Sequence, residues 1–325
     1  MKNLIIVRGG GDLATGTIYK LKKSGFSVLI LEAAQPSAIR RNVAFCEAVY
    51  QGTQTVEDMT CCLAESIDQA QQFLNEGKLP VLVDPAGESI STLNPLAVVD
   101  AILAKKNLGT TRNLAPITVA LGPGFTAGED VDAVIETKRG HNLGRVLWKG
   151  SAAPNTGIPG ILGGYGKERV VHCPAEGILR NVKKITDTVS KGDVIAIVET
   201  EKGTVPVEAT LDGILRGLIR DGYPVKRGFK MAARYRSGGK TVLVTTTRMF
   251  IEEDTLLTDD AIAILRALKE TGYVMAGLPE GEKNQTVVQR DLCFCLQLRG
   301  CSAGGSGRLQ VFAAEISQCG GTGDS

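Results

Sequence analysis

The chain has 325 residues, of which 43% are hydrophobic and 22% are charged, as is ordinary for a folded protein of two or three domains. These proportions exclude a largely disordered or collagen-like chain. The 37 basic and 35 acidic residues leave a net charge of +2, so the composition predicts no nucleic-acid partner and no attraction to an anionic membrane.

The start of the chain predicts no secretion signal. Its first apolar run, Leu4–Val7, is too short for one, and no run approaches the length of about 18 residues that a membrane span needs. We therefore expect a cytoplasmic protein whose eight cysteines are thiols.

Residues 4–32 have the pattern of a strand, a turn, a helix and a second strand. The strand run Leu4–Val7 leads into a glycine-rich turn, the helix pattern stops at Gly25, and the run Val28–Leu31 follows. This order is typical of an α/β fold that begins with a Rossmann-like nucleotide-binding domain, to which we assign residues 1–150.

The turn fits the motif G-x-G-x-x-A through Gly9, Gly11 and Ala14. Its glycines allow a tight turn and leave room for a phosphate at the free N–H groups of the following helix. Glu32 comes 21 residues after Gly11, where an acid can accept hydrogen bonds from a ribose and favours NAD over NADP. A Rossmann-like fold without a bound dinucleotide is the alternative. The expected cofactor-binding residues are Gly9, Gly10, Gly11, Asp12, Ala14 and Glu32.

Strands and helices continue to alternate up to about residue 135. The elements expected are a helix over 60–76, a strand over 79–83, a helix from Asn94 to about Asn107, and strands over 116–121 and 131–135. In a parallel sheet, ligands bind at the carboxyl ends of the strands. The glycine turn, Asp84 and the Gly122–Gly124 loop should therefore meet at that edge.

Several charged side chains of this part are candidate ligand contacts. Arg40 and Arg41 are adjacent, and such a pair either clamps a phosphate or simply faces solvent. His141 could serve as an acid or base or contact a substrate, although a lone histidine is more often structural. With Asp84 and Arg145, these residues are the expected anion or substrate contacts. No pattern identifies catalytic residues or a metal site.

The chain changes character after residue 150. Residues 151–168 are rich in glycine and proline and predict a linker, and residues 169–232 show short strand patterns. Gly177–Leu179 recurs as Gly213–Leu215, an offset of 36 residues. This repeat resembles the two halves of a biotinyl/lipoyl-like hybrid sandwich, so we expect a small all-β domain.

A lysine stands where carrier domains of that type are modified. In those domains the modified lysine lies on the hairpin between the two halves, and Lys202 occupies this place, seven residues before Ala209. Two interpretations remain open: a carrier lysine, or a solvated hairpin on a module without a carrier role. We favour the second, because a fold does not establish a function.

Six stretches of residues 1–232 form a specific set: Arg8–Gly16, Ile39–Gly52, Ala104–Thr110, Leu121–Asp130, Val134–Arg145 and Asn155–Gly160. Together they resemble the YqeB family, whose members are accessory proteins of selenium-dependent molybdenum hydroxylases. The resemblance implies a role in maturing such a hydroxylase, with that enzyme and its other accessory proteins as partners. It also implies action on the molybdenum cofactor, so a molybdopterin nucleotide is an expected ligand beside the NAD that the glycine motif and Glu32 indicate.

The resemblance changes after residue 232. Gly239–Phe250 and Met275–Lys283 resemble the YqeC accessory family, whose members are P-loop-like. Arg234 stands where a P-loop needs glycine, so we expect residues 233–283 to be a partial fragment without its P-loop. Residues 284–325 resemble neither family and are expected to be disordered, as a genuine extension or as the product of a shifted reading frame.

Three functions remain open, and the sequence does not decide whether the chain is an enzyme. The first is a maturation factor that binds molybdenum cofactor or a nucleotide. The second is an NAD-dependent oxidoreductase of a small substrate. The third is a lipoyl-type carrier that uses Lys202.

Overall fold

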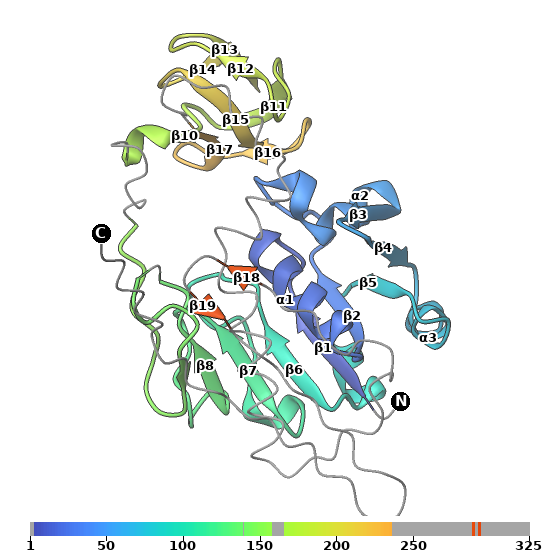
Figure 1. Ribbon diagram of the computed structural model, residues 1–325. Helices are drawn as coiled ribbons and strands as arrows, with labels where there is room; N and C mark the ends of the chain where they lie inside the picture. Colours follow the sequence, from blue (N-terminus) through green and yellow to red (C-terminus); the bar gives the residue numbers. More distant parts are fainter. Residues whose placement is uncertain (1–2, 139, 158–165, 236–287, 290–291, 294–325) are drawn as a thin grey trace, which may run out of the picture. The chain divides into compact units, whose positions relative to one another are not determined.

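The computed structural model describes residues 3–138, 140–157, 166–235, 288–289 and 292–293 (Figure 1). It divides into two compact units, Met1–Ala263 and Ile264–Ser325. In the second unit the described residues are a short antiparallel pair, β18 (Val288–Gln289) and β19 (Leu292–Cys293). Most of the expected YqeC-like fragment and disordered tail lies outside the described residues, so both stay predictions.

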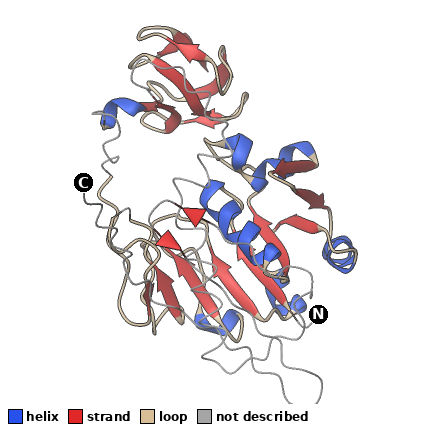
Figure 2. Cartoon of the chain, viewed as in Figure 1, coloured by secondary structure: helices blue, strands red, loops and turns tan. Residues whose placement is uncertain are grey.

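The N-terminal part of the first unit is built on a nine-stranded sheet with the order β3-β4-β5-β2-β1-β6-β7-β8-β9 (Figure 2). All strands from β4 across to β8 are parallel, and the two edge strands are antiparallel to their neighbours. The strands are β1 (Leu4–Arg8), β2 (Ser27–Glu32), β3 (Thr53–Val56), β4 (Met59–Ala64), β5 (Leu79–Val83), β6 (Ala97–Asp100), β7 (Thr118–Leu121), β8 (Ala133–Ile135) and β9 (Val146–Leu147).

Helices and the sheet bury each other's apolar side chains. Every residue of β1 is buried, as a central parallel strand requires. Ile18 and Leu21 of α1 are completely buried, and Leu74 of α3 joins a core cluster with Leu4 and Ile6 of β1. The helical segments are α1 (Asp12–Lys23), η1 (Arg41–Val43), η2 (Phe45–Glu47), α2 (Ala48–Gln51), α3 (Ile67–Asn75), α4 (Ser89–Leu93), η3 (Arg112–Leu114) and η4 (Lys167–Arg169).

The chain changes direction within the sheet between β1 and β6. From β1 it continues through α1 to β2 on one side, and it later returns to form β6 on the other side of β1. In open α/β sheets, ligands bind beyond the carboxyl ends of the strands at such a switch point. The turn after β1 and the loop after β6 are therefore the place to look for a site.

The strands expected near residues 4–7, 28–31, 79–83, 116–121 and 131–135 are confirmed as β1, β2, β5, β7 and β8, and the first helix is confirmed as α1. Their apolar runs coincide with their buried sheet positions, so pattern and packing agree.

The helix expected over residues 60–76 is wrong in its first third. Residues 60–64 belong to β4, which pairs in parallel with β5, and α3 begins only at Ile67. Ser66 caps that helix, since its hydroxyl oxygen accepts a hydrogen bond of 3.1 Å from the Gln69 N–H. Sheet pairing and this cap determine where the helix starts.

The helix expected from Asn94 to about Asn107 is also wrong. Asn94 does not begin a helix but ends α4 in a left-handed conformation, with φ of 44°. Residues 97–100 then form β6 between β1 and β7. The buried strand position outweighs the local resemblance to a helix start.

A small all-β domain follows, as expected. It consists of two four-stranded sheets with the orders β10-β17-β15-β12 and β14-β13-β11-β16. Its last strand ends at Tyr235, three residues beyond the expected boundary of residue 232. The strands are β10 (Val170–His172), β11 (Gly177–Asn181), β12 (Thr188–Val189), β13 (Val194–Thr200), β14 (Gly203–Glu208), β15 (Gly213–Leu218), β16 (Pro224–Val225) and β17 (Lys230–Tyr235).

The 36-residue repeat of the sequence relates the two sheets to each other. Strands β10 to β13 correspond to β14 to β17, and this exchange turns the order of the first sheet into that of the second. The shared core is paired in the same way: Val171 with Val207, Cys173 with Ala209, Leu179 with Leu215, Val189 with Val225, Ile195 with Met231, and Ala196 with Ala232. Each half therefore contributes equivalent side chains to one hydrophobic core.

Candidate functional site

Neighbouring backbone packs closely against the first two residues of the glycine turn after β1, whereas the third residue, Gly11, has free space beside it. A Cβ on Gly9, whose φ is +97°, would lie 2.9 Å from the carbonyl oxygen of Ala101. One on Gly10 would lie 3.1 Å from the backbone nitrogen of Cys46. Gly11, the residue before α1, has nothing within 4 Å of its Cβ position. The first turn of α1 is thus accessible at Gly11, as the motif predicts.

Glu32 supports this turn from the end of β2. Its Oε2 atom accepts a hydrogen bond of 2.7 Å from the Gly10 N–H, and its Oε1 accepts one of 2.7 Å from the Ala33 N–H. Burial raises the pKa of this carboxyl, and the two hydrogen bonds oppose the rise. Each carboxylate oxygen can accept a second hydrogen bond, so the role of Glu32 as a ribose contact stays a prediction.

A second support of the turn was not apparent from the sequence. The Thr15 hydroxyl donates to the Gly11 carbonyl at 2.8 Å and accepts from the Phe45 N–H at 2.9 Å. The Cys46 N–H donates to the Gly10 carbonyl at 2.8 Å. Burial is the main cause that raises the pKa of the Cys46 thiol, and the negative charges of nearby carboxylates raise it further. The segment around Cys46 therefore fixes the turn from outside the βαβ unit.

The side chains of the two adjacent arginines, Arg40 and Arg41, have different partners. Arg40 forms an ion pair with Asp12 in the first turn of α1. The Arg41 Nε atom donates to the Leu218 carbonyl at 2.7 Å, and its guanidinium is 3.8 Å from the Glu47 carboxylate. Of the predicted pair, Arg40 thus lies at the glycine turn, while Arg41 contacts the all-β domain.

One lysine of the all-β domain lies within electrostatic range of the charged residues at this turn. Loss of hydration lowers the pKa of Lys230, which lies on β17 of the all-β domain and remains exposed. The other charges that act on its ammonium group are those of Asp12, Arg40, Lys105 and Arg169. The group holds four basic residues and one acid, so its net charge suits an anionic ligand.

Sequence reasoning missed three of these basic residues. Lys105 lies in one of the stretches that resemble the YqeB family, and that was the available signal. Arg169 and Lys230 lie far along the chain, and folding alone brings them into this charged group.

The remaining expected contacts have other surroundings. The Asp84 carboxylate accepts hydrogen bonds of 2.6–3.0 Å from the backbone after β5 and from the Ser89 hydroxyl. Burial opposes its ionisation, but these bonds outweigh burial and lower its pKa. His141 and Arg145 are exposed on the loop after β8, three strands along the sheet from β1. The structure does not bring these side chains into the group at the glycine turn.

A buried arginine at the end of β1 was another feature that the sequence did not reveal. Arg8 donates to the Thr110 hydroxyl at 2.6 Å and to the Pro85 carbonyl at 2.9 Å, and it is 1% exposed. Thr110 in turn donates to Asp100 at 2.5 Å. These bonds join the loops after β5 and β6 beneath the glycine turn.

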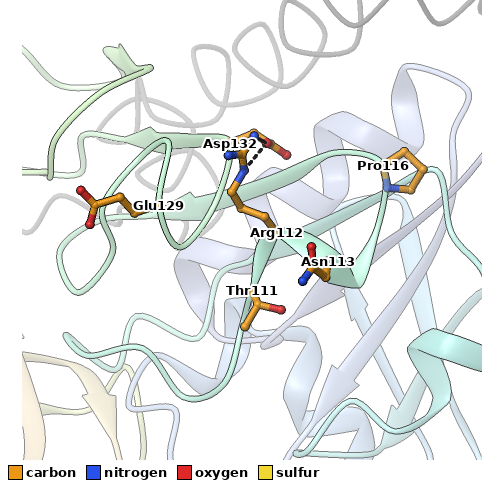
Figure 3. A pocket seen from close by; sticks show the side chains of 6 residues that line it. All are labelled: Thr111, Arg112, Asn113, Pro116, Glu129 and Asp132. Carbon is orange, nitrogen blue, oxygen red and sulfur yellow. Dashed lines mark hydrogen bonds and ion pairs between the residues drawn. The ribbon is translucent and has the colours of Figure 1, made fainter.

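A polar cavity of about 380 Å³ lies at the opposite edge of the sheet, before β7 and β8 (Figure 3). Its arginine, Arg112, is engaged by the Asp132 carboxylate at 2.8 Å. Asp132 also accepts 2.8 Å and 2.9 Å bonds from the Thr118 N–H and hydroxyl. The ion pair of Arg112 and Asp132 that Figure 3 shows therefore stabilises the fold. The cavity is lined by Thr111, Arg112, Asn113, Pro116, Glu129 and Asp132.

Lys202 lies on the hairpin between the two halves of the repeat, as expected. It stands on the two-residue turn between β13 and β14, where Thr200 pairs with Gly203, and it is exposed. The Thr200 hydroxyl donates to the Gly203 carbonyl at 2.7 Å, which closes the turn. The Lys202 side chain is thus presented at the tip of a hairpin.

Among the described residues, no helix is long and apolar enough to cross a membrane. In that same part of the chain, no group of three or more His, Cys, Asp or Glu side chains is arranged to hold a metal ion.

A family model agrees with the all-β domain. The model, described as "Biotin-requiring enzyme", matches residues 171–233. This match confirms the expected biotinyl/lipoyl-like domain, in which Lys202 occupies the central hairpin.

The motifs of the first 232 residues are confirmed as a resemblance to the YqeB family. The chain is 49% identical over 228 residues to YqeB of Escherichia coli (strain K12), across 70% of this chain and 41% of that protein. It thus spans less than half the length of this relative, which is described as uncharacterized. The YqeC-like resemblance of residues 233–283 stays a prediction.

Similarity to solved structures is weak. The ectoine utilization protein EutE from Ruegeria pomeroyi is 16% identical with a TM-score of 0.20, across 71% of this chain and 56% of that one. An aspartoacylase family protein from Mesorhizobium loti is 12% identical with a TM-score of 0.27, across 73% and 86%. Scores this low support no argument about function.

The glycine turn yields a stability prediction. Gly9→Ala should lower the free energy of unfolding by about 1–3 kcal/mol, because its Cβ would strain a positive φ and meet the backbone after β6. Gly11→Ala is the matched control and should cost less than about 1 kcal/mol, since its Cβ position is open. Urea unfolding of both variants checks this, and equal losses would contradict the described packing.

Glu32 yields a prediction of pH dependence. Because burial raises its pKa in the folded state, the folded protein binds this proton more tightly than the unfolded chain does. As pH rises from the ordinary value of 4.5 through the raised pKa, wild-type protein should lose stability that Glu32→Gln does not lose. Urea unfolding across this range measures the difference, and a difference that does not change with pH would overturn the assignment.

Proposed function

From the premise that 70% of this chain is 49% identical to YqeB, we propose that the protein is an accessory factor in the maturation of a selenium-dependent molybdenum hydroxylase. It binds a nucleotide, or a nucleotide form of the molybdenum cofactor, on a Rossmann-like domain. The observation that carries the proposal is the open first turn of α1 at Gly11, at the switch point of the sheet and beside four basic side chains. The hydroxylase and its other accessory proteins are the proposed partners.

The ligand's phosphate would occupy the space over Gly11. There the first N–H groups of α1 have no partner within the helix and favour an anion. The Asp12 carboxylate opposes an anion at this point, but Arg40 neutralises it. Lys105, Arg169 and Lys230 then supply the remaining positive charge.

An NAD-dependent oxidoreductase is the alternative at the same turn. Glu32 favours it, since the second lone pair on each carboxylate oxygen could accept a ribose hydroxyl. Thermal unfolding with NADH and with a molybdopterin nucleotide separates the two ligands. Stabilisation by NADH alone would count against the maturation role.

Gly11→Val tests the site. A branched side chain would fill the space assigned to the phosphate while keeping an extended φ of −64°, so the variant should fold but lose nucleotide binding. Isothermal titration with the molybdopterin nucleotide measures the loss, with Gly11→Ala as the smaller substitution. In cells that lack this protein, the wild type should restore hydroxylase activity and Gly11→Val should not. Unchanged affinity in the folded variant would exclude this turn as the site.

A carrier function through Lys202 is the second candidate, favoured by the exposed position of this lysine at the hairpin tip. If it holds, protein made with an active lipoyl or biotinyl ligase should gain one such group, and Lys202→Arg should gain none. Intact mass spectrometry reads the result. A wild-type mass without the addition would remove this candidate.

A further inference from the structure

The all-β domain is attached to the segment that faces the glycine turn. The Leu218 N–H at the end of β15 donates to the Ile39 carbonyl at 2.9 Å, and the Leu218 carbonyl accepts from Arg41 at 2.7 Å. Residues on both sides of Arg40 thus hold the backbone of Leu218. Arg40 itself is paired with Asp12 at the start of α1.

This attachment depends on a glycine. A Cβ on Gly217 would lie 2.7 Å from the Ile39 Cγ2 atom and 2.8 Å from its carbonyl oxygen. The two backbones therefore approach more closely than any side chain at position 217 would permit.

A buried carboxylate strengthens the contact. Arg220 donates to Glu47 at 2.9 Å, and its guanidinium lies 4.4 Å from the centre of the Tyr50 ring. Glu47 is only 1% exposed, and a carboxylate so buried is costly unless a cation accompanies it. Separating the domains would remove Arg220 from it, so this pair favours the attached arrangement.

The contact positions β17 as well. Leu218 faces Ala232 in the register of β15 and β17, and the Ile219 N–H donates to the Met231 carbonyl at 2.8 Å. A bulge in the pairing of β10 and β17 places Ala232 opposite the buried Val171 and Lys230 opposite the exposed His172, so Lys230 lies on the outer face of the strand, away from the core. Through these steps Lys230 is held near Arg40 and Asp12.

We propose that the nucleotide site spans both domains, with Lys230 in direct contact with the phosphate bound over Gly11. Arg220, Glu47 and Gly217 act as positioning residues, because they hold β17 beside the turn without touching the ligand. This inference rests on the nucleotide site proposed above. The ligand class is a nucleoside diphosphate or another nucleotide with a diphosphate group.

Isothermal titration of the full chain with ADP and with pyrophosphate tests the proposal. Lys230→Ala should weaken binding by roughly tenfold, as expected for the loss of one charged contact, and Lys230→Arg should restore most of it. Lys226→Ala is the matched control, since it removes the same charge from an exposed position of the same domain and should bind as the wild type does.

Gly217→Val tests the positioning role. It should weaken binding as much as Lys230→Ala, and the double variant should lose no more than either one alone, because both changes remove the same contact. Thermal unfolding verifies that each variant is folded. Lys230 is exposed, so Lys230→Ala should fold, and its titration still tests the proposal if Gly217→Val does not fold.

The outcomes separate this inference from the proposed function. If the wild type binds neither probe, or if Gly11→Val binds both normally, the nucleotide site itself is wrong. If Gly11→Val abolishes binding while Lys230→Ala binds like the wild type, the site stands and the contribution of the second domain is wrong.

Discussion

The close approach of the Gly9–Gly10 backbone to its neighbours is the constraint on which the rest of this site depends. With a Cβ at either position, the loop after β6 or the segment around Cys46 would have to move. Because both stay in place, α1 begins at a defined point with Gly11 open above it. The Glu32 carboxylate, the Thr15 hydroxyl and the buried Arg8 then hold the surrounding loops at fixed hydrogen-bond distances.

The sequence was informative where pattern and packing coincide. The apolar runs of β1 and β2 and the 36-residue repeat are local or periodic, so they could be recognised without knowledge of tertiary contacts. It was misleading at Met59–Ala64 and at Asn94, where pairing with distant strands decides the conformation. A short run of ordinary residues does not reveal whether a neighbouring strand is available.

The residues of the candidate site likewise divide into those with a local sequence pattern and those that only folding brings together. The glycine motif could be found because its spacing is local, whereas Lys230 lies more than 200 residues away from it in the chain. Asp84 shows the opposite case, since its carboxylate at the end of a strand accepts hydrogen bonds from the backbone of its own loop, and its role as a ligand contact stays a prediction. Residue type and strand-end position together do not distinguish a ligand contact from a cap.

The repeat in the all-β domain has a consequence for its two edges. A module built from two equivalent halves has two equivalent edges, and here those edges differ at the two positions next to the Ile39 contact. Gly217 corresponds to Asn181, and the buried Leu218 corresponds to Val182, which is 52% exposed. Gly217 has no side chain and approaches the backbone of Ile39, whereas in the equivalent edge Asn181 donates a hydrogen bond of 2.8 Å to the Ile219 carbonyl and Val182 faces solvent. The glycine at position 217 therefore lets only one of the two equivalent edges attach to a neighbouring segment.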